Sequence, residues 1–348
     1  MILISQFRKR LVVGSAAIAL AMTALFSPAA QADDEVIKWK VQSHWPGSSS
    51  SYKDSLERIK KVLAERTDGR LQLQLFEAGA LFKAQETFNA VSRGIIQMGT
   101  ISPGYAQDKL PLAGVASGLP FAFHHVWEAV YFHKNMGFED KLRAEAAKHG
   151  VYYSTDKIYP TEMVLKKPVN SWDDFTGLKI RSSGALQKFL TDAGAAGTYL
   201  PGGELYQALS SGVVDGAHWG ASQGAASMGL YEVAKYHVKP ALNIAGTDVF
   251  IVSQKALDAL PDGMAKIVKD SLEEQFWIRT NQYQHDEQIA LAKAQREQGV
   301  KVNVLPDDVQ KKLFQAAQKT WDKEAERSDA AAAAVKDLKK FLTDLGYL

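Results

Sequence analysis

Apolar and polar positions follow two different rhythms along the first part of the chain. The segment VIKWKVQSH (36–44) alternates residue by residue, as a half-buried strand does, and RLQLQLFEAG (70–79) repeats that pattern. Between them, YKDSLERIKKVLAERTDG (52–69) has apolar residues at helical spacing and ends on a glycine. This strand–helix–strand order predicts an α/β fold with crossover helices.

Two segments share one template. ETFNAVSRGIIQMG (86–99) and ELYQALSSGVVDGA (204–217) both run from a glutamate through an aromatic residue to a glycine and two β-branched residues. The template predicts a short helix that ends at the glycine and leads into a buried strand. We interpret the pair as evidence for two lobes of related construction. The alternative is that helix–glycine–strand units recur by chance in α/β proteins.

The last third of the chain is predicted to be helical. Pro261-Asp262 and Pro306-Asp307 are typical helix starts, each ahead of a periodic run, and an alanine-rich helix closes the chain. We expect residues 33–155 to form mainly the first lobe, 156–255 mainly the second, and 256–348 helices that pack across both. The expected fold is therefore α/β with two lobes.

The N-terminus has the pattern of a secretory signal peptide at 1–32. Arg8–Arg10 precede an apolar stretch, Leu11–Phe26, and Ala30–Ala32 supply a small-x-small cleavage site. A membrane span needs about 20 apolar residues, which makes an uncleaved anchor the weaker alternative. We therefore expect cleavage after Ala32 and a periplasmic location.

Charge and cysteine content narrow the class further. The signal removes three of the 41 basic residues, and the 38 that are left stand against 39 acidic ones. No lysine- or arginine-rich segment stands out, so we expect no nucleic-acid partner. Cysteine is absent, and the protein must therefore be stabilised by its core, without disulfides or an acylated cysteine.

Motifs for catalysis are missing. The sequence contains no G-x-S-x-G, no H-E-x-x-H, no P-loop and no cysteine nucleophile, and its eight histidines are scattered. We predict no enzymatic activity, no cofactor and no metal site.

Arg181 is the most informative polar residue. In GLKIRSSG (177–184) it ends a short strand, and Ser182 or Ser183 can cap the helix that follows. An arginine beside a helix N-terminus at the carboxyl end of a strand suits an anion, because the guanidinium matches a carboxylate with two parallel donors. A structural salt bridge is the open alternative. Trp219, at the end of the second template, is either a core residue or an apolar cleft wall.

The strings GLKIRSSG, GGELYQALSSGVVDGAHW (202–219) and YEVAKYHVKPALNIAGTDVFIVSQKALDALP (231–261) resemble the solute-binding proteins of tripartite ATP-independent periplasmic (TRAP) transporters, and the likeness extends over nearly the whole mature chain. The chain is most similar to the branch that takes 2-oxo acids and related monocarboxylates. The resemblance implies the fold of a two-lobed periplasmic binding protein, with a ligand cleft between the lobes, crossing strands and a long connecting helix. It also implies a non-enzymatic subunit that closes on a small carboxylate and delivers it to a sodium-driven membrane permease. It implies that Arg181 holds the carboxylate and that Trp219, Tyr105 and Trp45 line the cleft.

Two departures from the family pattern affect the expected ligand. His218 stands where metal-assisted 2-oxo acid binders have an acidic residue, so we expect no bound sodium or calcium. The strand near Thr161 lacks the second arginine of dicarboxylate binders and carries Glu162, which would repel a second carboxylate if it faced the cleft. An outward or salt-bridged Glu162 is the alternative.

Together these features predict a TRAP solute-binding subunit for a small monocarboxylate, either a 2-oxo or 2-hydroxy acid or an aromatic acid, with ligand-binding residues Arg181, Trp219, Tyr105, Trp45, Glu162 and His218. We expect a monomer. One alternative is a secreted enzyme acting on small acids, with His218 and a carboxylate as its acid–base pair. The other is a periplasmic sensor subunit that shares the site and differs in its partner.

Overall fold

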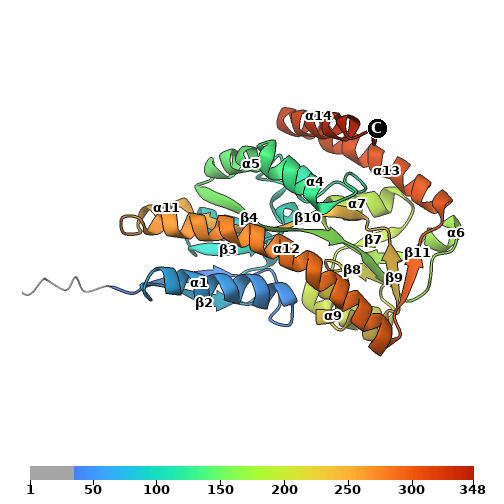
Figure 1. Ribbon diagram of the computed structural model, residues 1–348, viewed down its shortest axis with the longest axis horizontal. Coiled ribbons are helices and arrows are strands. Elements are labelled where there is room, and N and C mark those ends of the chain that lie inside the picture. Colours follow the sequence, from blue (N-terminus) through green and yellow to red (C-terminus); the bar gives the residue numbers. More distant parts are fainter. Residues whose placement is uncertain (1–34) are drawn as a thin grey trace, which may run out of the picture. The chain divides into compact units, whose positions relative to one another are not determined.

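The computed structural model describes residues 35–348, so the expected signal peptide and its cleavage site lie outside the described residues. Lys38–Leu348 form one compact unit. Within it the chain builds two mixed α/β lobes, each on its own sheet (Figure 1). The prediction of a two-lobed α/β fold is confirmed.

The first lobe is built on a sheet of five strands in the order β2-β1-β3-β10-β4. Its strands are β1 (Ile37–Gln42), β2 (Leu71–Phe76), β3 (Met98–Ile101), β4 (Val151–Thr161) and β10 (Asn243–Ser253). In β2 the leucines Leu71 and Leu73 are buried and the glutamines between them are exposed, as the alternation predicted. β1 runs parallel to β3, and β10 runs antiparallel to both β3 and β4.

The second lobe is built on a sheet of six shorter strands in the order β11-β9-β5-β8-β6-β7. Its strands are β5 (Met163–Leu165), β6 (Lys179–Arg181), β7 (Ala196–Thr198), β8 (Gly216–His218), β9 (Tyr236–Lys239) and β11 (Lys301–Val304). β6 runs parallel to β7 and β8, and β5 runs antiparallel to β8 and β9.

The two sheets repeat one arrangement. The order β2-β1-β3-β10 in the first sheet corresponds to β7-β6-β8-β5 in the second, and in each the fourth strand is the antiparallel one. The shared sequence template forms α2 (Thr87–Ser92) with β3 and α8 (Leu205–Ser211) with β8. Gly94 and Gly212 follow the two helices with φ of 68° and 79°, a left-handed conformation that suits glycine. The template therefore marks the same position in both lobes.

The chain crosses between the lobes twice at one place. β4 ends at Thr161 in the first sheet, and β5 begins at Met163 in the second. β9 ends at Lys239 in the second sheet and leads into β10 in the first. The expected lobe boundaries at 155 and 255 fall within or just after these crossing strands and remain predictions.

Helices cover both sheets. In the first lobe they are η1 (Tyr52–Glu57), α1 (Arg58–Arg66), η2 (Ala84–Glu86), α2, η3 (Pro103–Ala106), α3 (Ala113–Ala116), α4 (Val126–Val130), η4 (Tyr131–Asn135) and α5 (Phe138–Ala147). In the second lobe they are α6 (Trp172–Phe175), α7 (Gly184–Asp192), η5 (Gly202–Glu204), α8, α9 (Ser222–Ser227) and α10 (Leu230–Val233).

The C-terminal helices are α11 (Gln254–Asp258), α12 (Met264–Gln298), α13 (Asp307–Ala325) and α14 (Asp329–Asp344). α12 runs along β4 and on to α9, so it contacts both lobes (Figure 1). Its Phe276 belongs to the apolar core of the first lobe and its Ala294 to a core cluster of the second. α13 behaves likewise, with Trp321 in the first core and Leu313 in the second. These two helices therefore join the lobes independently of the crossing strands.

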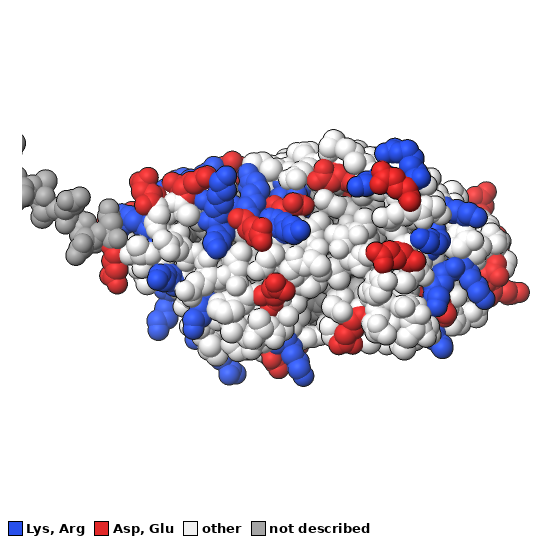
Figure 2. All heavy atoms as spheres, turned by 90° about the horizontal axis from the view of Figure 1, so that it is seen from below, with Lys and Arg blue, Asp and Glu red and all other residues white. Residues whose placement is uncertain are grey.

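Basic and acidic side chains are interspersed on the surface. Figure 2 shows blue and red groups side by side across one face, with no broad field of one sign on it. Many are neighbours at helical spacing, such as Lys266 with Asp270 and Lys340 with Asp344. No helix among residues 35–348 has the length and apolarity that a membrane crossing needs.

Candidate functional site

A cavity of about 80 Å³ lies where the two lobes meet. Equivalent strands of the two sheets deliver its lining at their carboxyl ends. The chain after β1 and β3 supplies Trp45 and Tyr105, and the chain at the ends of β6 and β8 supplies Arg181, His218 and Trp219. Ligands of α/β proteins bind at such strand ends. Five of the six predicted site residues thus line one cavity.

Arg181 is buried, with 2% of its surface exposed. Its Nε donates to the carbonyl of Leu200 and its Nη1 to the carbonyl of His218, both at 2.9 Å. These two bonds fix the plane of the guanidinium, while Nη2 is buried and has no hydrogen-bond partner in the described structure. A buried donor without a hydrogen-bond partner is costly, and an acceptor placed beside Nη2 would remove that cost.

The surroundings of Arg181 are aromatic. The ring centroids of Trp219 and Tyr199 lie 5.2 and 5.8 Å from its guanidinium carbon. Burial lowers the pKa of Arg181, and the hydroxyls of Tyr105 and Tyr199 oppose that shift. Arginine stays protonated in proteins, so the cavity has a fixed positive charge at this end. Ser183 occupies the N-cap position of α7 and makes no capping bond with its side chain.

His218 is a neutral residue in this site. Burial, together with the charge of Arg181, lowers its pKa to about 3. Its Nε2 lies 2.8 Å from Ser182 Oγ, and no ion pair between His218 and a carboxylate occurs among the described residues. The acid–base pair that the enzyme alternative requires is therefore not assembled around His218.

Close packing fixes Trp219. A Cβ added to Gly202 would lie 2.3 Å from the Trp219 ring, and one added to Gly224 would lie 1.9 Å from the Trp219 carbonyl oxygen. A side chain at Gly202 would displace the indole, and one at Gly224 would displace the Trp219 backbone, which explains both glycines. On the other lobe, Lys157 Nζ lies 4.6 Å from the ring centroid of Trp45.

Glu162 is the one predicted site residue that does not line the cavity. It is buried and paired with Lys239 and His237, both from β9. Burial by itself would raise the pKa of Glu162, but His237 and Lys239 hold it below the usual value. The structure thus matches the salt-bridged alternative.

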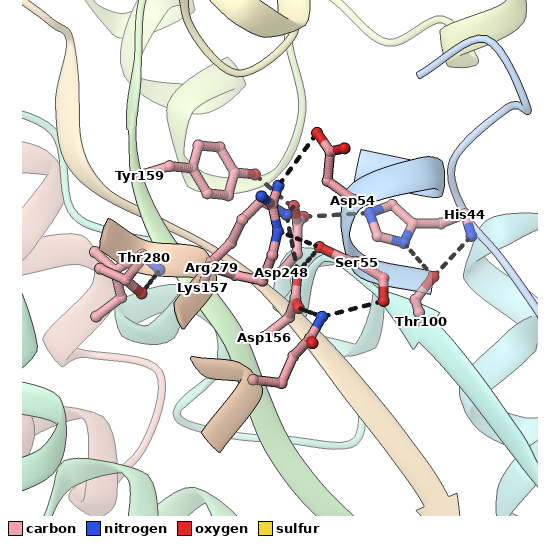
Figure 3. Close-up of polar contacts among 12 residues, drawn as sticks. His44, Asp54, Ser55, Thr100, Asp156, Lys157, Tyr159, Asp248, Arg279 and Thr280 are labelled. Carbon is pink, nitrogen blue, oxygen red and sulfur yellow. Dashed lines mark hydrogen bonds and ion pairs between the residues drawn. The ribbon is translucent and has the colours of Figure 1, made fainter. Parts of the chain in front are cut away.

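The sequence analysis missed a network on the wall of the first lobe (Figure 3). Asp248 on β10 lines the cavity and accepts hydrogen bonds from Tyr159 on β4 and from Lys157 Nζ, at 3.1 and 2.7 Å. His44 Nε2 lies 3.2 Å from the same carboxylate. The available signal was Lys157 with Asp156 in the strand YSTDKIY and a single aspartate, Asp248, in the largely apolar strand IAGTDVFIV.

The network continues behind Asp248. Lys157, fully buried, also contacts Asp156 Oδ2 at 3.0 Å. Asp156 in turn accepts from Ser55 and Gln275, and Ser55 accepts from Arg279 (Figure 3). Burial alone would raise the pKa of Asp248, but Lys157 and His44 hold it well below its usual range. The wall therefore carries an ionised carboxylate.

Residues 35–348 contain no cluster of three or more histidine, cysteine, aspartate or glutamate side chains placed to bind an ion. Serine and threonine hydroxyls line much of the rest of the cavity. The arrangement suits a small polar anion held by hydrogen bonds.

Two related lobes joined by crossing strands, with a cavity lined from both, define a two-lobed solute-binding protein. The model of the bacterial extracellular solute-binding protein family 7 (DctP) matches residues 42–328. The chain belongs to this family, the DctP-type solute-binding proteins of TRAP transporters, which are periplasmic.

Individual relatives agree with this assignment. The chain is 28% identical over 291 residues to the monocarboxylate 2-oxoacid-binding periplasmic protein of Nostoc sp., covering 79% of this chain and 78% of the relative. A TRAP solute-binding protein of Bordetella bronchiseptica, solved with calcium and picolinate, superposes with a TM-score of 0.81 at 24% identity, covering 90% of this chain and 93% of that one. A Bordetella pertussis receptor that binds pyroglutamic acid gives 0.79 at 20% identity, covering 88% and 100%. The two structures show a shared fold.

Proposed function

We propose that this protein captures a small organic acid in the periplasm and delivers it to the membrane permease of a sodium-driven TRAP transporter. The single observation that carries the proposal is Arg181, whose buried Nη2 has no partner while the rest of its guanidinium is fixed. A carboxylate is the group that completes such a fork with a charge-assisted hydrogen bond.

The proposed ligand class is a monocarboxylate, either a 2-oxo or 2-hydroxy acid or an aromatic acid. Trp45, Tyr105 and Trp219 give the cavity apolar surfaces beside Arg181. Glu162 and Lys239 neutralise each other, and the lining holds no second arginine for a second carboxylate. The Nostoc relative binds monocarboxylate 2-oxoacids, which supports this class.

The proposed mechanism is closure of the two lobes on the ligand. Arg181 belongs to the second lobe, and Trp45 and Tyr105 to the first. A solute that contacts both sets favours the closed arrangement by the difference between its affinities for the two states. Closure also excludes water, which strengthens the bond between Arg181 and the carboxylate.

The test is a thermal-shift and calorimetry screen of the mature protein against carboxylic acids, with and without sodium or calcium. A bound acid raises the melting temperature by mass action, and we expect the shift to be independent of the cation. Arg181→Ala should abolish it, because removing one partner of a buried charge pair costs about 3–5 kcal/mol. Arg93→Ala, on an exposed arginine, is the matched control. Near-normal affinity in Arg181→Ala would disprove the proposed anchor.

A further inference from the structure

The cavity has two poles of opposite charge. Arg181 lines it from the second lobe and Asp248 from the first, and the two do not form an ion pair with each other. Asp248 is paired with Lys157, whereas Arg181 donates to the carbonyl oxygens of Leu200 and His218. The cavity therefore offers donors at one end and a carboxylate at the other.

The cavity wall around Asp248 carries hydroxyl groups that already donate their protons in hydrogen bonds to other protein groups. Tyr159 donates its hydroxyl proton to Asp248, Ser117 donates to the carbonyl of Ala113, and Thr247 donates to the carbonyl of Ala116. Each hydroxyl has one proton, so the oxygen that remains can only accept. We call Ser117, Tyr159, Thr247 and Asp248, which all line the cavity, the acceptor wall.

His44 adds to the polarity of this wall. Thr100 Oγ1 accepts from the His44 backbone N–H and lies 2.9 Å from His44 Nδ1, so its own proton is available to Nδ1. His44 then carries its proton on Nε2 and donates it to Asp248 (Figure 3). Three donors occupy the Asp248 carboxylate, which offers about four acceptor positions, so one remains for a ligand.

A cation is a poor occupant of this position. Lys157 Nζ already lies 2.7 Å from Asp248 Oδ2, and its fixed positive charge would repel a second cation beside the same carboxylate. A neutral O–H or N–H group meets no such repulsion. A ligand with no donor would instead leave desolvated acceptors unpaired, which is costly in a closed cavity.

We propose that Asp248 and the acceptor wall select acids that carry an O–H or N–H donor in addition to the carboxylate held by Arg181. The inference rests on the proposed function. It narrows the ligand class to hydroxy acids and acids with an N–H group, which should bind more tightly than 2-oxo acids that carry no donor. Asp248 is then the specificity-determining residue, with Tyr159 as the second contact.

The experiment compares acids of nearly equal shape by calorimetry. Lactate is paired with propionate and mandelate with phenylacetate. Pyroglutamate is paired with the lactone analogue in which the ring ester oxygen replaces the ring N–H. We expect the acid with the donor to bind at least about tenfold more tightly than its partner in the pair. The acid without a donor would leave polar groups of the site unpaired, which costs affinity. Arg181→Ala should abolish binding of both members.

Substitutions then locate the selectivity. Asp248→Asn keeps the shape of the side chain but offers an amide in place of the carboxylate, and we expect the preference within a pair to fall towards unity. Tyr159→Phe removes a second acceptor and should reduce the preference in the same direction if Asp248→Asn fails to fold. Asp270→Asn, at an exposed ion pair, is the matched control and should leave the preference unchanged.

The outcomes separate the two proposals. Equal affinity within every bound pair, abolished by Arg181→Ala, would overturn this inference and leave the proposed function standing. Binding of donor-free acids that requires sodium or calcium would also overturn it, since a cation would then occupy the wall. Failure of every acid to bind would overturn the proposed function and this inference together.

Discussion

At the scale of single residues, Lys157 is the most heavily constrained side chain near the site. It is fully buried, contacts Asp156 and Asp248, and lies over the rings of Trp45 and Tyr159. An ammonium group in such a position is stable only with its partners, and the partners depend on it equally. One lysine therefore supports both the crossing strands and the cavity wall.

Lys157→Met should lower the free energy of unfolding by about 3–5 kcal/mol, because it leaves two buried carboxylates without their cation. Urea denaturation of the ligand-free protein measures the loss. Lys266→Met removes the same group from an exposed pair with Asp270 and should change stability by about 0.5 kcal/mol or less. Equal effects of the two substitutions would show that Lys157 is not buried as described.

At the scale of elements, Glu287 connects the long helix α12 to α9. Its Oε1 accepts from the backbone N–H of Gln223 at the start of α9. Burial raises the pKa of Glu287 to about 7, against a usual value of 4.5. The contact holds α9, which follows Trp219, against the helix that joins the lobes.

This contact predicts a dependence of stability on pH. A carboxyl whose pKa is raised on folding binds its proton more tightly in the folded state, so its contribution falls as pH rises from about 4.5 to about 7. Glu287→Gln keeps the accepting oxygen without a charge. Relative to wild type, it should gain up to about 3 kcal/mol of stability between pH 4 and pH 8.

The measurement is urea denaturation of both proteins across that range. The quantity compared is the difference in free energy of unfolding between the two proteins. Both contain His133 and His218, whose pKa values are lowered to about 3. These histidines make the stability of both proteins rise with pH up to about 6.5, and the difference removes that contribution. A difference that does not change with pH would contradict the raised pKa of Glu287.

At the scale of the whole molecule, the cavity depends on both lobes at once. Side chains of the two lobes approach each other near it: Gln223 Nε2 lies 3.4 Å from Asp54, and the ring centroids of Tyr105 and Tyr199 lie 6.3 Å apart. The elements that connect the lobes, β4, β10 and α12, each contribute to the lining through Tyr159, Asp248 and Tyr283. In the proposed mechanism a ligand adds contacts to both lining surfaces.

A bound acid should slow amide hydrogen exchange on both sides of the cavity, in residues 43–52 of the first lobe and 218–228 of the second. At a concentration about 100 times its Kd, the acid should add about 2.7 kcal/mol of stability. Hydrogen exchange followed by mass spectrometry measures the effect, with Arg181→Ala as the control that should show none. Protection confined to the second lobe would contradict closure.

Local sequence patterns predicted several of the strands and helices and the position of Arg181. Alternation and helical spacing predicted β1, β2 and α1, because these elements bury one face whose period is local. The repeated template predicted the equivalent positions of β3 and β8, and the pattern around Arg181 placed it at a strand end. Each of these inferences needs only residues near one another along the chain.

The wall of the site around His44 and Asp248 depends on tertiary contacts between residues far apart in the sequence. His44 and Asp248 are 204 residues apart, and no local pattern shows that they meet. Glu162 pairs with Lys239 because β5 runs antiparallel to β9. The register that sets Val164 opposite His237 brings the residue before β5 beside the end of β9. The acceptor wall exists because the carbonyl of Ala113 accepts from Ser117, just after α3, and the carbonyl of Ala116 accepts from Thr247 on β10. These contacts depend on packing rather than on residue type.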